Sequence, residues 1–422
     1  MGLKDLDFSN IELPKVELPK VELPKVDIKN PLDIIDHSFN KPDINRDVSM
    51  LKGQLANNGY DWWWHSFTGK NKFTGEERSF FIEFFTINPE LGGKEPVLGQ
   101  LPANKENGKK PSYLMVKVGT WGKDACQLHR FFGWDQVNIK AEAPFLISAD
   151  NCFLSETRTL GRVEISPEVA ESHPEYLTDA GAMTWDLKID KKIAFNVGYG
   201  AGKMLRDMDA FQMFWHAEGM KTAFSGEVVF NGTQYEVSPE TCYGYADKNW
   251  GSDFTSPWIW LSSNDVVSKI TGKRLENTVF DIGGGRPKVG PLSIENTVLS
   301  AFWYEGQAYE FNFSKFWTLT KTVMKTKETK SKMIWRILQE TPVAKMLIQV
   351  ECPKSEMLKI RYESPDGAFR HKNLWNGGTG EAEIKLYKKN ISLKNKWEWE
   401  LVDYMEAHHV GCEYGVYDEE KK

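Results

Sequence analysis

Short runs of aromatic and β-branched residues, separated by turn-forming Gly, Pro and Asn, recur along the chain from about residue 61. Such runs favour β-strands because branched and flat side chains pack well on a pleated surface. The runs lie at 79–86, 113–121, 127–134, 346–351, 358–363, 381–387 and 397–404. Helical periodicity is weak, with candidate helices at 205–219 and 331–340. We therefore expect an all-β protein with few short helices.

Two hairpins are marked by their turn residues. Asn231-Gly232 interrupts the strand-like segment 227–237, and this dipeptide suits the two positive φ angles of a type I′ turn. Glu305-Gly306 is the second expected turn, within the segment 297–313. Each hairpin predicts an antiparallel pair of strands, and together they place sheet structure in both halves of the chain.

The first 46 residues differ from the rest. The pentapeptide Val-Glu-Leu-Pro-Lys, or a close variant, recurs over 11–25. Pro at every fifth position removes a backbone donor and disfavours helix at the preceding residue. We expect an extended N-terminal tail over 1–46, which is either a plain tether or a segment that docks on a partner through its Val and Leu side chains.

Charge and hydropathy restrict the partners and the location. The chain has 53 Lys and Arg against 59 Asp and Glu, a net charge of −6, so it is a poor counterion for nucleic acid. No segment reaches the roughly 18 apolar residues of a membrane-spanning helix. The first 30 residues lack the apolar region of a secretory signal. We expect a cytoplasmic protein that makes at most transient peripheral contact with membranes and does not bind nucleic acid.

Cysteine, histidine and glycine patterns argue against the common metal and cofactor sites. The five cysteines are an odd number with no Cys-x-x-Cys pair, unlike a disulfide framework or a zinc site. His408 and His409, near Cys412, are adjacent in a predicted strand and so face opposite ways, which prevents both from binding one ion. The glycines at 198–202 match neither a phosphate loop nor a dinucleotide motif. We expect no metal and no cofactor.

The segment Tyr-Gly-Tyr-Ala-Asp-Lys-Asn-Trp-Gly is the most specific stretch of the sequence. In a strand its side chains alternate between two faces. One face then holds Tyr245, Asp247 and Asn249, and the other holds Lys248 and Trp250. A carboxyl group desolvated among aromatic rings is biased towards its protonated form, as a general acid requires. The alternative is a structural Asp247 that pairs with backbone or with an Arg.

Asp247-Lys248-Asn249-Trp250-Gly251, followed by Trp258 and Trp260, resembles the signature of the tocopherol cyclase family, which is related to carotenoid hydratases of the hydroxyneurosporene synthase type. Weaker similarity runs from about Asp61 to Tyr414 and includes the stretch around Glu83, the pair Trp215-His216 and Gly284-Gly285-Arg286. Plant-type cyclases have Glu where this chain has Asp247. The resemblance implies two lipocalin-like β-barrel or sandwich domains, over 47–265 and 266–418, around a large apolar cleft that takes prenyl lipids.

The activity that the resemblance implies is acid-catalysed cyclisation, hydration or isomerisation of a prenyl lipid without a redox cofactor. An alkene is protonated, and a phenol oxygen or water captures the resulting carbocation. Asp247 is the expected proton donor, tuned by Tyr245 and Asn249. Aromatic faces stabilise cations, so the cavity is expected to be lined by Trp215, Trp250, Trp258 and Trp260. Core packing is the alternative explanation for the 13% aromatic content.

Two further residues are candidates for the site. In a strand Glu83 shares a face with Phe81 and Phe85, where a carboxyl group must be protonated or paired; an edge-strand Glu that faces water is the alternative. His216 either orients the acid, acts as a base towards a phenol, or is a satisfied semi-buried histidine.

Two other functions stay open. A carrier of isoprenoid lipids on the same fold needs the same cavity but no proton donor. Recognition of carbohydrate by an exposed Trp62-Trp63-Trp64 run is the third hypothesis.

Overall fold

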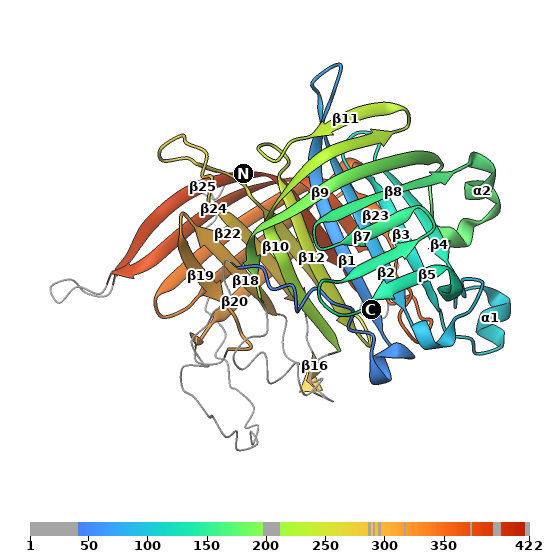
Figure 1. Cartoon of the computed structure of the whole chain (residues 1–422). Helices are drawn as coiled ribbons and strands as arrows, with labels where there is room; N and C mark the ends of the chain where they lie inside the picture. Colours follow the sequence, from blue (N-terminus) through green and yellow to red (C-terminus); the bar gives the residue numbers. More distant parts are fainter. Residues whose placement is uncertain are drawn as a thin grey trace.

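The computed structural model describes residues 41–196, 212–285, 288–289, 292–293, 297–315, 318–371, 374–390 and 398–417. The repeats of the expected tail therefore lie outside the described residues. Within the described residues almost all regular structure is β-strand, and two large curved sheets stand side by side (Figure 1). The predicted all-β fold, with two barrel-like sheets and few short helices, is confirmed.

The first sheet is formed by the first half of the chain. In the described residues it has 12 strands in the order β4-β3-β2-β1-β11-β10-β9-β8-β7-β6-β5, and β12 pairs with both β1 and β10. The strands are β1 (Tyr60–Asn71), β2 (Glu77–Ile87), β3 (Tyr113–Thr120), β4 (Cys126–Phe132), β5 (Val137–Lys140), β6 (Leu146–Ala149), β7 (Cys152–Ser155), β8 (Arg158–Ile165), β9 (Gly181–Phe195), β10 (Met213–Phe230), β11 (Thr233–Val237) and β12 (Gly244–Gly251).

The second sheet follows from the other half. Its path is β19-β18-β15-β13-β25-β24-β22-β21-β20, with β14 paired to β25 and β23 to β24. The strands are β13 (Trp258–Ser263), β14 (Asp265–Ser268), β15 (Val279–Gly285), β18 (Thr297–Tyr304), β19 (Gln307–Phe311), β20 (Lys321–Glu328), β21 (Lys332–Glu340), β22 (Ala344–Pro353), β23 (Leu358–Ile360), β24 (Leu374–Asn390) and β25 (Glu398–Gly415). A separate two-stranded ribbon pairs β16 (Lys288–Val289) with β17 (Leu292–Ser293).

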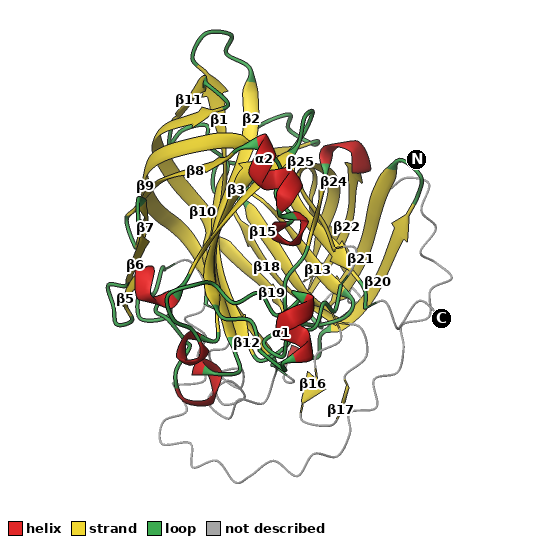
Figure 2. Ribbon diagram, turned by 90° about the vertical axis from the view of Figure 1, so that its right-hand side faces the viewer, coloured by secondary structure: helices red, strands yellow, loops and turns green. Residues whose placement is uncertain are grey.

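The chain passes from the first sheet to the second between Gly251 and Trp258. The expected boundary between the two domains follows residue 265. It therefore leaves β13, a strand of the second sheet, in the first domain. The described α-helices are short and peripheral, and Figure 2 shows them outside the sheets. They are α1 (Pro102–Glu106) and α2 (Pro167–Ser172). Single 3-10 turns occupy Gly53–Ala56, Pro89–Leu91, Trp134–Gln136, Pro174–Tyr176 and Lys354–Glu356.

Both predicted hairpins are confirmed. β10 and β11 pair up to Phe230 and Thr233, and Asn231-Gly232 turns with φ of 47° and 81°. β18 and β19 turn at Glu305-Gly306 in the same way, with φ of 42° and 92°. Both predicted helices are wrong in the described residues, because Met213–Phe230 is strand β10 and Lys332–Glu340 is strand β21. Residues 205–211 lie outside the described residues.

Each sheet curves around its own hydrophobic core, and a further core lies between the sheets. β1 contributes to two of them: Trp63 packs in the core of the first sheet, while Trp62 and Trp64 pack in the core between the sheets. This is why β1 and β12 are buried along nearly their whole length. The second sheet adds Trp258 and Trp260 to the shared core, and the candidate site lies there.

Candidate active site

A cavity of about 160 Å³ lies between the two sheets. Aromatic and small apolar side chains form most of its wall, together with two acids, Asp247 from β12 and Glu413 from β25. The lining residues are Arg46, Trp62, Trp64, Gln212, Met213, Phe214, Trp215, Asp247, Asn249, Trp250, Thr255, Trp258, Ile259, Trp260, Gly283, Gly284, Gly285, Leu299, Phe313, Ser314, Tyr362 and Glu413.

All four tryptophans expected at the cavity line it. Trp250 does so although alternation places it on the face of Lys248; it stacks on Phe214 at 5.6 Å between ring centroids. The wall also contains Trp62 and Trp64, which belong to the run that the third hypothesis took as exposed and carbohydrate-binding. That hypothesis is wrong, since Trp62, Trp63 and Trp64 are at most 5% exposed. They are buried because β1 is the strand on which both cores meet.

Asp247 is buried beside the cavity, with one oxygen bound and the other without a partner. Its Oδ2 accepts hydrogen bonds from Trp215 Nε1 at 3.0 Å and from the Tyr245 hydroxyl at 3.1 Å. Its Oδ1 has no hydrogen-bond partner among the described residues. Burial raises the pKa of Asp247 well above its usual value, and the nearby Glu413 raises it further, against the two hydrogen bonds.

Tyr245 joins Asp247 to a second carboxyl group that the sequence analysis missed. The Tyr245 hydroxyl lies 3.0 Å from Asp281 Oδ2, and Trp260 Nε1 lies 3.1 Å from Asp281 Oδ1. A phenol has one proton and can donate to only one of the two carboxyl groups, so the other must supply its own proton. At least one of Asp247 and Asp281 is therefore protonated. Burial, and then the proximity of Asp247, raise the pKa of Asp281 as well.

Glu413 is the second acid in the cavity wall and was also missed. Its Oε2 accepts a hydrogen bond from Trp258 Nε1 at 2.6 Å, and its Oε1 accepts one from Asn376 Nδ2 at 2.5 Å. Burial raises the pKa of Glu413 to about 7, while these two donors favour the ionised form. The sequence holds a local signal for each: Asp281 is the single acid of β15, and Glu413 is the single acid of the segment 410–415 at the end of β25.

Asn249 and Lys248 lie as alternation predicts. Asn249 lines the cavity and its Oδ1 accepts a hydrogen bond from the Tyr60 hydroxyl at 2.9 Å. Lys248 points to the other face of β12, where it pairs with the buried Asp61 and lies 4.0 Å from the ring centroid of Trp63. The Tyr60 hydroxyl therefore fixes the Asn249 amide at the cavity wall.

Glu83 lies behind the cavity wall. It is fully buried on β2, between β1 and β3, so the alternative of an edge-strand Glu facing water is wrong. Its carboxylate pairs with Lys117 at 2.5 Å and accepts a hydrogen bond from the Tyr362 hydroxyl at 3.0 Å. Burial raises the pKa of Glu83, and Lys117 opposes the shift. Glu83 contacts the cavity wall through Tyr362, which lines the cavity.

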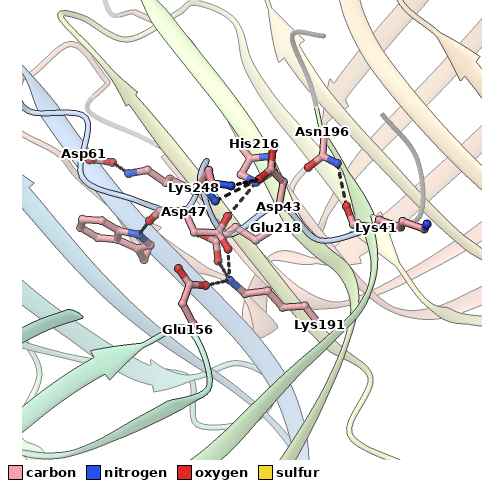
Figure 3. Close-up of polar contacts among 12 residues, drawn as sticks. Lys41, Asp43, Asp47, Asp61, Glu156, Lys191, Asn196, His216, Glu218 and Lys248 are labelled. Carbon is pink, nitrogen blue, oxygen red and sulfur yellow. Dashed lines mark hydrogen bonds and ion pairs between the residues drawn. The ribbon is translucent and has the colours of Figure 1, made fainter. Parts of the chain in front are cut away.

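His216 lies on the opposite face of its sheet from Asp247, in a cluster of buried charges shown in Figure 3. Its Nε2 lies 3.0 Å from Asp47 Oδ1. Burial lowers the pKa of His216 to about 4, so the imidazole is neutral. The neighbouring Lys191 Nζ contacts three carboxylates, those of Asp47 at 2.5 Å, Glu218 at 2.8 Å and Glu156 at 3.0 Å. The structure thus groups His216 with these charges and not with the cavity.

The histidines near the C-terminus are paired with acids. His408 Nδ1 lies 2.5 Å from Glu381, and His409 lies 2.7 Å from Asp265 and 2.5 Å from Glu77. Within the described ranges no three His, Cys, Asp or Glu side chains are arranged to hold a metal ion.

None of the helices among the described residues is long and apolar enough to cross a membrane.

Comparisons with known proteins agree with the signature. The family model described as tocopherol cyclase-like matches residues 183–411, more than half of the chain. No curated protein matches the chain.

Three solved structures are similar to this one at low identity. A putative AttH from Nitrosomonas europaea has 12% identity and a TM-score of 0.42, covering 83% of this chain and 92% of that one. CghA with Sch210972 has 11% identity and a TM-score of 0.41, covering 86% and 89%. Kievitone hydratase from Nectria haematococca has 10% identity and a TM-score of 0.41, covering 90% and 98%.

Proposed function

Because the chain belongs to the tocopherol cyclase-like family, we propose that it is an enzyme that protonates an isolated alkene of a prenyl lipid through Asp247. The observation that carries the proposal is the state of this carboxyl group. It is buried at an aromatic cavity, its Oδ2 is held by two donors, and its Oδ1 has no hydrogen-bond partner among the described residues. A protonated Oδ1 has no acceptor among the residues that the structure describes and can give its proton to a ligand.

The aromatic wall supports the same chemistry. Protonation of a trisubstituted alkene produces a tertiary carbocation, which is costly in an apolar cavity without compensation. Each indole face offers about 0.5–2 kcal/mol of cation–π stabilisation and is a weak nucleophile. Trp215 on β10 and Trp258 and Trp260 on β13 line the cavity together with the acid. Capture of the cation by phenol or water, or loss of a neighbouring proton, then gives cyclisation, hydration or isomerisation, none of which requires a redox cofactor.

The substrate class follows from this chemistry. An apolar, aromatic cavity suits a branched hydrocarbon chain, and the polar groups at its wall suit a phenol or water that captures the cation. Prenyl lipids partition into bilayers, so the proposal includes transient contact with a membrane surface.

The test is deuterium incorporation in D₂O. The purified protein is incubated with a hydroquinone that carries a prenyl chain and, separately, with a linear polyene hydrocarbon, and the organic extract is analysed by mass spectrometry. We expect deuterium on a carbon of the former double bond. Asp247→Asn should lower incorporation by about 10²- to 10⁴-fold, the usual contribution of a general acid, and leave binding intact. Asp281→Asn is the matched control for a carboxylate lost from the same network.

An isoprenoid carrier would give a different result. A carrier would bind the same lipids without introducing deuterium into them. Its affinity for these lipids would be unchanged by the Asp247→Asn substitution. Co-purification of a prenyl lipid with wild-type protein that shows no incorporation with either probe would overturn the enzymatic proposal.

A further inference from the structure

The cavity wall holds two carboxyl groups on different sheets. Asp247 lies on β12 of the first sheet and Glu413 on β25 of the second, and both line the cavity. Both are buried, at 8% and 7% exposed. Only one of them has a role in the proposed protonation.

The hydrogen bonds distinguish the two groups. Both oxygens of Glu413 accept N–H donors, from Trp258 and from Asn376. Neither donor can accept a proton through these atoms, so both bonds favour the carboxylate. Asp247 has both donors on Oδ2, and Oδ1 is left without a partner among the described residues. The geometry suits an ionised Glu413 and a protonated Asp247.

We propose that Glu413 is the general base of the reaction and removes the proton of the phenol or water that captures the carbocation. This inference rests on the proposed function and adds a second catalytic residue to it. Two acids in one cavity with opposite protonation states form a general acid and general base pair.

The proton balance is closed. The O–H bond of Asp247 breaks and a C–H bond forms on the alkene. The capturing oxygen then forms a C–O bond to the cation, and its O–H bond breaks as Glu413 takes the proton. The enzyme is left with Asp247 ionised and Glu413 protonated, and solvent exchange on product release returns one proton from Glu413 to Asp247. No electrons are transferred to or from the substrate.

Charged neighbours of Glu413 come from several elements. Asp247 faces it from β12, and Lys117 on β3 and Glu83 on β2 act on it from the first sheet. The charge of Glu413 in turn raises the pKa of Tyr362. Lys117 favours the ionised form and Glu83 opposes it, and both effects are smaller than those of the hydrogen bonds from Asn376 and Trp258. The donors Trp258 and Asn376 are left as the main support of the carboxylate.

The decisive experiment separates protonation from capture. Wild type, Glu413→Gln and Asp247→Asn are incubated in D₂O with the prenylated hydroquinone, and cyclised product is measured beside deuterium in recovered and isomerised alkene. We expect Glu413→Gln to form about 10²-fold less cyclised product while deuterium in the alkene stays within about threefold of wild type. Asp247→Asn should lose both. An equal loss of both in Glu413→Gln would show a structural role and overturn the inference.

The pH profile gives a second, independent readout. A base must be ionised, so kcat/KM for the cyclised product should rise with pH through the pKa of Glu413, about 7. Asn376 does not line the cavity, and Asn376→Leu removes one donor to the carboxylate. We expect this variant to move the rising limb upward by about one pH unit. A rising limb that does not move in Asn376→Leu would overturn the inference. This test remains valid even where the Glu413→Gln variant does not fold.

Failure of the two proposals can be told apart. If wild type incorporates no deuterium at all, the proposed function fails, and the role of Glu413 fails with it. If wild type incorporates deuterium and cyclises, and Glu413→Gln cyclises at the wild-type rate, only the role of Glu413 is refuted.

Discussion

At the scale of single residues, the acid strength of Asp247 depends on the hydrogen bonds to its Oδ2. Tyr245 donates to a carboxyl group that is otherwise held there only by Trp215 among its described partners. A donor stabilises the ionised form, so its removal raises the pKa further and makes the proton harder to transfer. The hydroxyl of Tyr245 is therefore a positioning group whose effect is visible in the pH dependence.

We predict that Tyr245→Phe lowers the rate of deuterium incorporation by about tenfold and moves the falling limb of the kcat profile to higher pH. The sign follows because the acid must be protonated and its pKa rises. The check is the profile of deuterium incorporation against pH. Asn249→Ala is the control and should leave the limb in place, since Asn249 lines the same wall but is bound by Tyr60. A limb that stays in place in Tyr245→Phe would show that Tyr245 does not set the pKa of Asp247.

Glu83 and Lys117 form a buried pair close behind Tyr362. Removal of one partner leaves an uncompensated buried charge, which costs about 3–5 kcal/mol of unfolding free energy. We predict this loss for Lys117→Met, and a smaller loss for the double variant Lys117→Met with Glu83→Gln. Chemical denaturation measures both. Equal losses in the single and double variants would show that the cost comes from packing and not from the unpaired charge.

At the scale of elements, β1 is the wall shared by two cores. Trp63 stacks on Phe145 at 5.1 Å inside the first sheet and donates to the Asp47 carbonyl. Trp62 stacks on Trp258 and Tyr362, at 5.6 Å and 5.3 Å, across the gap between the sheets. Neighbouring residues on one strand thus serve different purposes because the strand is pleated.

We predict that Trp62→Ala and Trp63→Ala both destabilise the protein, by about 3–5 kcal/mol each. Only Trp62→Ala should also weaken binding of the prenyl probe, by about tenfold or more, since Trp63 does not line the cavity. Denaturation curves and lipid titrations on the two variants make the comparison. Equal effects on affinity would mean that the cavity wall is not formed as the strand alternation indicates.

At the scale of the whole molecule, the buried charges of the first sheet contribute to the pH dependence of stability. One Lys191 ammonium faces three carboxylates and cannot neutralise them all. Burial opposes ionisation of Asp47, but Lys191 and His216 outweigh it and keep its pKa low. Burial raises the pKa of Glu218 to about 7 and that of Glu156 to about 8. These last two groups hold protons that the unfolded chain would release.

A carboxyl group whose pKa is raised on folding stabilises the protein at pH below its unfolded pKa, and that contribution is lost as pH rises through the folded pKa. For Glu218 and Glu156 the loss extends to about pH 7 and about pH 8. The neutral His216 acts in the opposite sense, because its stabilisation is lost as pH falls from 6.5 towards about 4.

We therefore predict that the unfolding free energy falls between about pH 6.5 and pH 8, and that Glu218→Gln makes this fall shallower. Urea denaturation across that interval measures it. His216→Gln is the comparison, because it changes the pH dependence only at lower pH. If the unfolding free energy falls as steeply in Glu218→Gln as in wild type, Glu218 is already ionised in the folded protein.

Features that depend on neighbouring residues were predictable from the amino-acid sequence. The Asn231-Gly232 dipeptide favours the positive φ angles that its turn adopts, and runs of aromatic and β-branched residues favour strands. A period of two then places the side chains of Asp247 and Lys248 on opposite faces of β12. These features follow from local sterics and alternation, so they could be predicted without coordinates.

The same local rules failed where the sequence fits both periods or where burial removed the alternation. In β21 Ile334, Ile337 and Leu338 are spaced like a helical stripe, whereas the buried side chains Met333, Trp335 and Ile337 follow the period of two of a strand. β10 is buried at every residue from 216 to 220 and has register shifts, so its apolar residues lack a period of two there.

Which acids share the cavity depends on tertiary packing, which the local pattern does not contain. Asp281 and Glu413 belong to the second sheet and reach Asp247 through long-range packing of two sheets against one another. His216 and Glu83 were separated from Asp247 because the pleat and the neighbouring strands direct them elsewhere. Strand alternation fixes the face on which a side chain lies, whereas its partners depend on which strands, distant in sequence, the hydrophobic cores bring together.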